Sequence, residues 1–167
     1  MLQKAAFCNS DFVVDMFAKA VQRMSELGID QWDELYPSES IIRSDIENGR
    51  MYIGCLNDSI VSAVTLNEQQ DPEYDEVAWK FSCGRICVIH RLCVHPDKHG
   101  KGIGKKTIML IEEVAACLHY DYIRLDAFTN NPTALSIYKS LGNQYAGDVT
   151  FRKGKCHCFE KTLTQNQ

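Results

Sequence analysis

Three glycines, each separated from the next by one residue, lie between a predicted buried strand and a predicted amphipathic helix. They belong to the run His99-Gly100-Lys101-Gly102-Ile103-Gly104, which Lys105 follows. Glycine lets the backbone approach a ligand closely, and the first turn of a helix presents free N–H groups and a positive dipole end. Four lysines surround the glycines, at positions 98, 101, 105 and 106. The loop is therefore predicted to bind an anion, and a pyrophosphate is the natural ligand.

The segment before the glycines, residues 85–95, is the most strand-like part of the sequence. Strict alternation places Ile86, Val88, His90, Leu92 and Val94 on one face, and Cys87, Ile89, Arg91 and Cys93 on the other. Both faces are largely apolar, which is typical of a strand in the middle of a sheet. The segment after the glycines repeats apolar side chains at helical spacing over residues 103–119, so a helix is predicted there.

The other elements follow from the same periodicities. The patterns predict helices over residues 10–27, 38–48 and 132–141, strands over residues 2–7, 51–56, 60–66 and 122–127, and a last hairpin around residues 152–155. A chain of 167 residues matches one domain, and no repeat or linker divides it. We therefore predict a single α/β domain over residues 1–167, in which about four helices flank a strongly twisted mixed sheet of six or seven strands.

Charge and hydropathy disfavour several classes of function. A formal net charge of −4 disfavours a nucleic-acid-binding protein, because such proteins are usually basic. No apolar run approaches the roughly 20 residues that span a bilayer, so no membrane contact is expected. Residues 1–15 lack the features of a signal peptide, and we expect a cytoplasmic protein. The state of assembly stays open between a monomer and a homodimer.

The eight cysteines fit a reducing compartment, because most of them lie inside apolar helix or strand patterns. The run Cys156-His157-Cys158 contains zinc-ligand residue types, but no second pair of ligands stands at finger spacing. We expect these side chains to pack in the fold, and we expect no metal cofactor.

Two other anion-binding loops do not match the spacing. A nucleotide P-loop has four residues between its first glycine and its Gly-Lys pair, whereas this chain has three between Gly100 and Gly104. A dinucleotide-binding loop requires a different glycine rhythm and an acidic ribose ligand farther along the chain, and this sequence has neither.

The loop resembles the pyrophosphate loop of the GNAT superfamily of acetyl-CoA-dependent N-acetyltransferases, written Gln/Arg-x-x-Gly-x-Gly/Ala. Residues 91–97 look like that family's fourth strand and its exit, and residues 131–142 look like its later helix. Two positions depart from the usual pattern, because His99 replaces Gln or Arg and Asn143 stands where an aromatic residue often follows the glycine.

The resemblance implies acetyl-CoA as co-substrate and a small-molecule or peptide amine as acceptor. It implies that the cofactor enters between the fourth and fifth strands and contacts the loop from His99 to Lys105. The strand segment Leu92-Cys93-Val94 would bind the pantetheine arm through its backbone, and Asn131 would also contact the cofactor. A non-catalytic acyl-CoA-binding or sensing module is the alternative function.

Tyr138 follows Asn131 by seven residues, which is close to two helical turns and places both side chains on one face. A thioester attacked by an amine expels a thiolate, and a phenol beside that sulfur can protonate it. We therefore predict that Tyr138 is the general acid; the competing interpretation is a tyrosine that only packs on the helix face.

The attacking amine must lose a proton, and His90 is the predicted base because its ordinary pKa is near neutral. A structural histidine is the other interpretation, with a carboxylate such as Glu76 acting through water instead. Direct transfer in a ternary complex requires no acyl-enzyme, and Cys93 is predicted to face away from His90. Trp32 and Tyr36 are candidates for the acceptor wall or for helix packing, and the acidic stretch 68–76 is a candidate for attracting a cationic amine.

Overall fold

One seven-stranded sheet organises the protein, whose computed structural model describes residues 1–163. The strands are β1 (Leu2–Lys4), β2 (Met51–Leu56), β3 (Ser59–Asn67), β4 (Ile86–Val94), β5 (Tyr122–Phe128), β6 (Gln144–Phe151) and β7 (Gly154–Thr162). Their order across the sheet is β1-β2-β3-β4-β5-β7-β6. The pair β4–β5 is parallel and the other pairs are antiparallel. The mixed α/β fold with a sheet of this size is as predicted.

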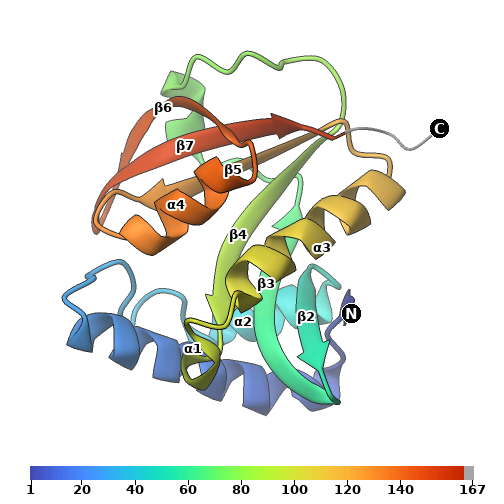
Figure 1. Ribbon diagram of the computed structural model, residues 1–167, viewed down its shortest axis with the longest axis vertical. Coiled ribbons are helices and arrows are strands. Elements are labelled where there is room, and N and C mark those ends of the chain that lie inside the picture. Colours follow the sequence, from blue (N-terminus) through green and yellow to red (C-terminus); the bar gives the residue numbers. More distant parts are fainter. Residues whose placement is uncertain (164–167) are drawn as a thin grey trace.

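Two pairs of helices cover opposite faces of the sheet. The helices are α1 (Ser10–Glu26), α2 (Glu39–Glu47), α3 (Ile103–Cys117) and α4 (Pro132–Ser140). Figure 1 shows α3 and α4 in front of the sheet, α2 behind it and α1 running beneath. One apolar core lies between the sheet and α3 and α4, and a second lies between the sheet and α1 and α2. The prediction of about four helices is confirmed.

A short 3-10 helix, η2 (Pro72–Glu76), lies over the half of the sheet that contains β4 to β7. Its buried Tyr74 packs with Val88 of β4 and Cys158 of β7 in a third apolar cluster. The sequence analysis assigned no helix to this acidic stretch. Glu73, Asp75 and Glu76 flank Tyr74 in the sequence, and the packing of this buried tyrosine holds the segment against the sheet.

Local signals set most element boundaries correctly. Ser38 caps α2, because its hydroxyl accepts a hydrogen bond from the Ile41 N–H at 3.4 Å. Asn57 and Asp58 have positive φ angles of 48° and 61°, which suits the two-residue turn between β2 and β3. The first strand is shorter than predicted, because a 3-10 turn, η1 (Phe7–Asn9), begins soon after it. Residues 164–167 of the predicted domain lie outside the described part.

Strands β4 and β5 separate halfway along their length. Their register runs from Ile86 opposite Tyr122 to Ile89 opposite Leu125 and goes no further. On the other side of β4, Thr65 pairs with His90 and Ala63 pairs with Cys93. One residue of β3 therefore faces two residues of β4, which is a β-bulge. The bulge begins at Arg91, two residues after the last pair with β5.

The bulge corrects the predicted alternation of this strand. Arg91 adopts a left-handed conformation with φ 51°, so the side chains after it change faces. Leu92 packs with the core under α3 and α4, whereas Cys93 packs with α1 and lies on the same face as His90. The prediction that Cys93 faces away from His90 is wrong, because strict alternation assumes a strand without an inserted residue.

Candidate functional site

A cavity of about 1070 Å³ occupies the opening between β4 and β5. Its wall includes His90 to Val94 of β4, Asp126 to Phe128 of β5, the glycine loop, α4, the end of α1, and the turn between β6 and β7. Side chains from both faces of the sheet therefore line one space. A ligand that enters on the α3 side can meet a second ligand that enters on the α1 side.

The glycine loop forms the α3 end of this cavity. Gly100 and Gly102 have φ angles of 74° and 72°, and a Cβ at either position would meet no atom within 4 Å. These glycines are therefore required by backbone conformation and not by crowding. Gly102 precedes α3 and provides no side-chain cap.

The first turn of α3 carries free donors. The first backbone bond of the helix runs from the Lys106 N–H to the Gly102 carbonyl at 3.1 Å. The N–H groups of Ile103, Gly104 and Lys105 have no hydrogen-bond partner in residues 1–163. All three residues line the cavity. The end of the helix thus offers uncapped donors and a positive dipole to an anion.

The cationic and imidazole side chains of the loop differ in their placement. Lys98 and Lys105 line the cavity and form no ion pair within the described chain. Lys101 lies outside the cavity wall, and its ammonium donates to the Asp97 carbonyl at 3.2 Å. The His99 ring nitrogen Nε2 lies 3.0 Å from the Val94 carbonyl oxygen, so His99 ties the loop to the end of β4.

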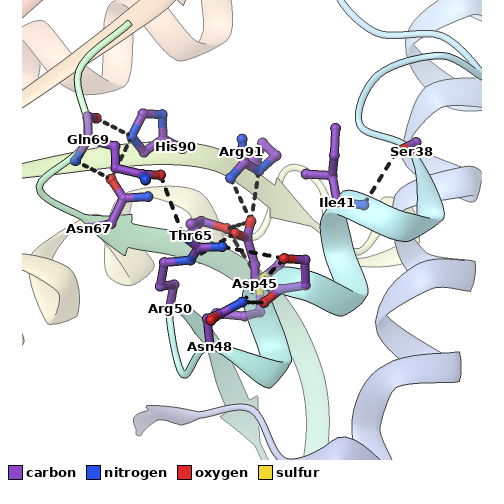
Figure 2. A network of polar contacts seen from close by, with 12 residues as sticks. Ser38, Ile41, Asp45, Asn48, Arg50, Thr65, Asn67, Gln69, His90 and Arg91 are labelled. Atoms are coloured by element: carbon purple, nitrogen blue, oxygen red, sulfur yellow. Dashed lines mark hydrogen bonds and ion pairs between the residues drawn. The ribbon is translucent and has the colours of Figure 1, made fainter.

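A buried ion pair holds the β4 bulge in place (Figure 2). Asp45 of α2 is only 3% exposed, and its Oδ2 accepts from Arg91 Nη2 at 2.5 Å and from Thr65 Oγ1 at 2.7 Å. Arg91 also donates from Nη1 to the Tyr36 hydroxyl at 3.0 Å. The left-handed conformation of Arg91 costs roughly 1–2 kcal/mol, and the buried pair keeps the side chain in place because breaking it would leave an uncompensated charge. The sequence analysis missed Asp45.

His90 is held in one tautomer. Its Nε2 lies 3.0 Å from both the Asn67 Oδ1 and the Gln69 carbonyl oxygen. The Asn67 atom is an oxygen acceptor, because it also accepts from the Gln69 N–H at 2.8 Å. Nε2 therefore carries the proton, and Nδ1 keeps its lone pair. Figure 2 shows His90 beside Asn67 and Gln69.

The surroundings of His90 favour the neutral ring. Burial, and secondly the Arg91 charge, lower the pKa of His90 below its ordinary value. His90 also lines the cavity, whereas Glu76, the competing candidate, is exposed and does not. The arrangement offers a neutral imidazole nitrogen to a proton donor.

Tyr138 and Asn131 both line the cavity, as their spacing predicted. Tyr138 is 6% exposed and packs against Phe159 of β7. Burial raises the pKa of Tyr138 well above its ordinary value, so the phenol stays protonated at neutral pH. Its hydroxyl forms no hydrogen bond within the described residues. Asn131 caps α4 through the Ala134 N–H at 3.2 Å and donates to Gln31 at 3.0 Å.

The α1 end of the cavity is built from side chains. Trp32 packs against Phe17 of α1 with ring centroids 5.6 Å apart, and both Trp32 and Tyr36 line the cavity. The sequence analysis left acceptor wall and helix packing as alternatives, and in the structure Trp32 packs on α1 and also lines the cavity. The cations of this end have carboxylate partners: Arg23 with Glu26, Arg91 with Asp45, Arg152 with Asp33, and Lys153 with Asp30 and Asp33.

Unpaired carboxylates also line this end. Asp71 and Glu73 form no ion pair among residues 1–163. Asp126 of β5 accepts a hydrogen bond from the Tyr74 hydroxyl at 2.8 Å. Burial raises the pKa of the Asp126 carboxyl to about 6. The sequence analysis did not select Asp126, although a single carboxylate in a strand that is apolar apart from Arg124 was the available signal.

The Cys156-His157-Cys158 run packs in the fold. Both cysteines are buried, and the His157 Nδ1 lies 2.6 Å from Asp148 on the neighbouring strand. Residues 1–163 contain no group of three or more side chains arranged to hold a metal ion. The same residues include no helix long and apolar enough to cross a membrane.

Comparison with known proteins gives a family. The model of the acetyltransferase (GNAT) family matches residues 18–142. The thialysine N-epsilon-acetyltransferase of Bos taurus is 32% identical over 135 residues, which cover 76% of this chain and 74% of that protein. The family match extends from α1 to the end of α4 and includes every residue of the glycine loop that lines the cavity.

Solved structures share the fold. A GNAT family acetyltransferase from Streptococcus agalactiae superposes with a TM-score of 0.88 at 22% identity, covering 98% of this chain and 95% of that one. A structure of an acetyltransferase from Salmonella typhimurium with its cofactor acetyl-CoA superposes with a TM-score of 0.72 at 13% identity, covering 99% and 95%.

Proposed function

This chain belongs to the GNAT family of acetyltransferases, and we propose that it moves the acetyl group of acetyl-CoA to a primary amine of a small cationic acceptor. The observation that carries the proposal is that the two ends of the cavity have opposite charge. One end offers uncapped helix N–H groups and unpaired lysines, and the other end offers unpaired carboxylates. An anionic donor and a cationic acceptor would approach from opposite faces of the sheet and meet where β4 and β5 separate.

The donor end fits coenzyme A. Its pyrophosphate would accept hydrogen bonds from the first turn of α3, with Lys98 and Lys105 adding charge. Past Ile89, β4 has no register partner in β5, so its backbone edge can pair with the amides of the pantetheine arm. The acetyl-CoA named with the Salmonella typhimurium structure supports this placement on the shared fold. Lys101 is withdrawn from the set, because it lies outside the cavity wall.

His90 and Tyr138 supply the proton transfers in this proposal. The His90 Nδ1 takes a proton from the acceptor ammonium, and the neutral amine then attacks the thioester carbonyl. The carbon–sulfur bond breaks as the amide forms, and the Tyr138 hydroxyl protonates the departing thiolate. Of the two protons that nitrogen loses, one restores Tyr138 and the other leaves His90 for solvent. No covalent enzyme intermediate is needed, and burial raises the pKa of Cys93, which keeps it a thiol.

The acceptor is a small amine with a net positive charge near the reacting nitrogen. Asp71, Glu73 and Asp126 provide the complementary charge, and Tyr36 and Trp32 provide apolar wall. The Bos taurus relative is named for acetylating thialysine, whose side chain ends in a primary amine. The eight cysteines, free where the structure describes them, suit a cytoplasmic reaction.

The test is an acetylation assay that follows the release of coenzyme A thiol. Thialysine, spermine and a peptide with a free N-terminus serve as acceptors, with ATP in parallel calorimetric titrations as a control for the loop. Turnover of thialysine or spermine, with one-site binding of acetyl-CoA and none of ATP, is the expected result. Acetyl-CoA binding without turnover of any amine would instead favour a non-catalytic acyl-CoA-binding module.

A further inference from the structure

Asp126 is placed at the point where the sheet opens. It follows Leu125, the last β5 residue with a register partner in β4, so the next β4 residue, His90, stands across the opening from it. Both side chains lie on the α1 side of the sheet, because Asp126 bonds to Tyr74 and His90 is paired with Thr65. Both line the cavity.

The charge of Asp126 has no cationic partner in the described residues. Its Oδ1 accepts from the Tyr74 hydroxyl at 2.8 Å, and the Cys156 thiol is its other hydrogen-bonding neighbour. No lysine, arginine or histidine forms an ion pair with it in residues 1–163. Asp126 is half-buried, and a carboxylate that is partly withdrawn from water is stabilised by a nearby cation, because its charge is costly to desolvate. The missing cation is therefore expected from a ligand.

The cations at the α1 end of the cavity do not supply it, because they are paired with other carboxylates. Arg91 is bound to Asp45, and Arg152 is bound to Asp33. Arg124 lies on the same strand, but it donates to the Phe81 carbonyl and to Gln70, both at 2.5 Å, and stacks on Trp79. Each arginine of this region is fixed on another partner, so the Asp126 carboxylate faces an open space.

We propose that Asp126 is a catalytic residue that binds the reacting ammonium of the acceptor beside His90. This inference rests on the proposed N-acetyltransferase function and adds the residue that selects a charged amine. The ammonium donates one N–H to Asp126 and a second to the His90 Nδ1. The proton on the second bond moves to His90, which leaves a neutral amine that is still bound to Asp126 and aimed at the thioester.

The groups around Asp126 set its pKa and therefore its charge. Its titratable and charged neighbours are Tyr74, Asp71 and Glu73 on the η2 side, Cys156 and Cys158 on β7, Tyr138 on α4, Tyr36 in the loop before α2, and His90 on β4. Burial, followed by the acidic neighbours, raises the pKa of Asp126 to about 6, whereas Tyr74 and Cys156 lower it. At neutral pH the group is ionised at a cost that a bound ammonium would remove.

The free-energy cost of ionising Asp126 makes stability depend on pH, and this dependence can be measured as a shift in Tm. A carboxyl whose pKa is higher in the folded chain than its ordinary value of 3.8 lowers stability as the pH rises between the two values. Asp126→Asn keeps the shape and an acceptor for Tyr74, and it removes the charge. We expect its Tm at pH 7.5 to exceed that of the unaltered protein by a few degrees, with the difference vanishing near pH 4.

Kinetics test the binding role. With thialysine and spermine as acceptors, Asp126→Asn is expected to lower kcat/KM about 10- to 100-fold, mostly through KM, while the Kd of acetyl-CoA is unchanged. Asp75→Asn is the matched control, because Asp75 is exposed on η2 and does not line the cavity; an unchanged kcat/KM is expected. At pH values below the pKa of both groups, log kcat/KM should fall with a slope near 2 in the unaltered enzyme and near 1 in Asp126→Asn.

Binding separates this inference from the proposed function. Calorimetry with spermine in the presence of coenzyme A measures the cation site without turnover. Binding that depends on Asp126 without any acetylation would sink the proposed function and leave the cation site standing. Turnover with an unchanged KM in Asp126→Asn, or a fall in Tm at pH 7.5, would overturn the role of Asp126 and leave the acetyltransferase standing.

Discussion

The two ends of the cavity are built in different ways. At the α3 end, recognition comes from backbone N–H groups in one continuous loop, and the neighbouring lysines are unpaired. At the α1 end, it comes from side chains of α2, β4, β5 and η2 that hold one another through buried bonds. A backbone site depends on local conformation, whereas a side-chain site depends on the packing of distant segments.

The largest effect that separates the two ends concerns Asp45. Asp45→Asn leaves Arg91 buried without its counter-ion, and the free energy of unfolding should fall by about 3–5 kcal/mol. Asp11→Asn is the control, because Asp11 pairs with Arg43 at the surface with 91% of its side chain exposed, and less than about 1 kcal/mol is expected. Urea denaturation of both variants measures the contrast. Equal losses would mean that the bulge does not depend on the ion pair.

The next largest effect concerns Tyr138, which the proposed mechanism places at the thioester, between the two ends of the cavity. Tyr138→Phe should reduce kcat about 100-fold while leaving the Kd of acetyl-CoA nearly unchanged, because only the proton donor is lost. Tyr145→Phe is the matched control, since Tyr145 is 57% exposed and lies outside the cavity wall. Steady-state kinetics and calorimetry measure both variants. A Tyr138→Phe enzyme with full turnover would assign Tyr138 to packing alone.

A smaller effect tests the backbone end. Gly102→Ala forces a left-handed alanine, which should cost roughly 1–2 kcal/mol of stability and tilt the first turn of α3, so that acetyl-CoA affinity falls about tenfold. Gly142→Ala carries the same strain, with φ 80° and open space, but it lies after α4 and outside the cavity wall. Gly142→Ala should therefore lower the free energy of unfolding by a similar amount and leave the affinity for acetyl-CoA unchanged. Equal affinities in the two variants would contradict the role of the helix terminus.

The smallest effect concerns the lysines. Lys105→Ala should weaken acetyl-CoA binding by less than about fivefold, and the loss should shrink as salt is raised, because an exposed charge is screened. Lys106→Ala is the neighbouring control, since Lys106 is exposed and does not line the cavity. Calorimetry at low and high salt measures both. If Lys105→Ala lost much of its affinity for acetyl-CoA at both salt concentrations, the lysine side chain and not the backbone would be the main source of binding energy.

The glycine loop, the capped start of α2 and the turn at Asn57 and Asp58 were all predictable, because each depends on a few neighbouring residues. The alternation of β4 failed at Arg91 for the opposite reason. The inserted residue there places Arg91 against Asp45, a buried partner 46 positions earlier in the chain. No periodicity within the strand carries that information.

The sequence by itself determined the mixed sheet, the anion loop and the shared placement of Asn131 and Tyr138, since backbone propensities and helical spacing act over short distances. The family resemblance carried by those residues is confirmed. Only the tertiary structure decided the face of Cys93, the tautomer of His90 and the isolation of Asp126. Each depends on which charges and hydrogen-bond partners packing brings within a few ångströms, and those partners come from other elements of the chain.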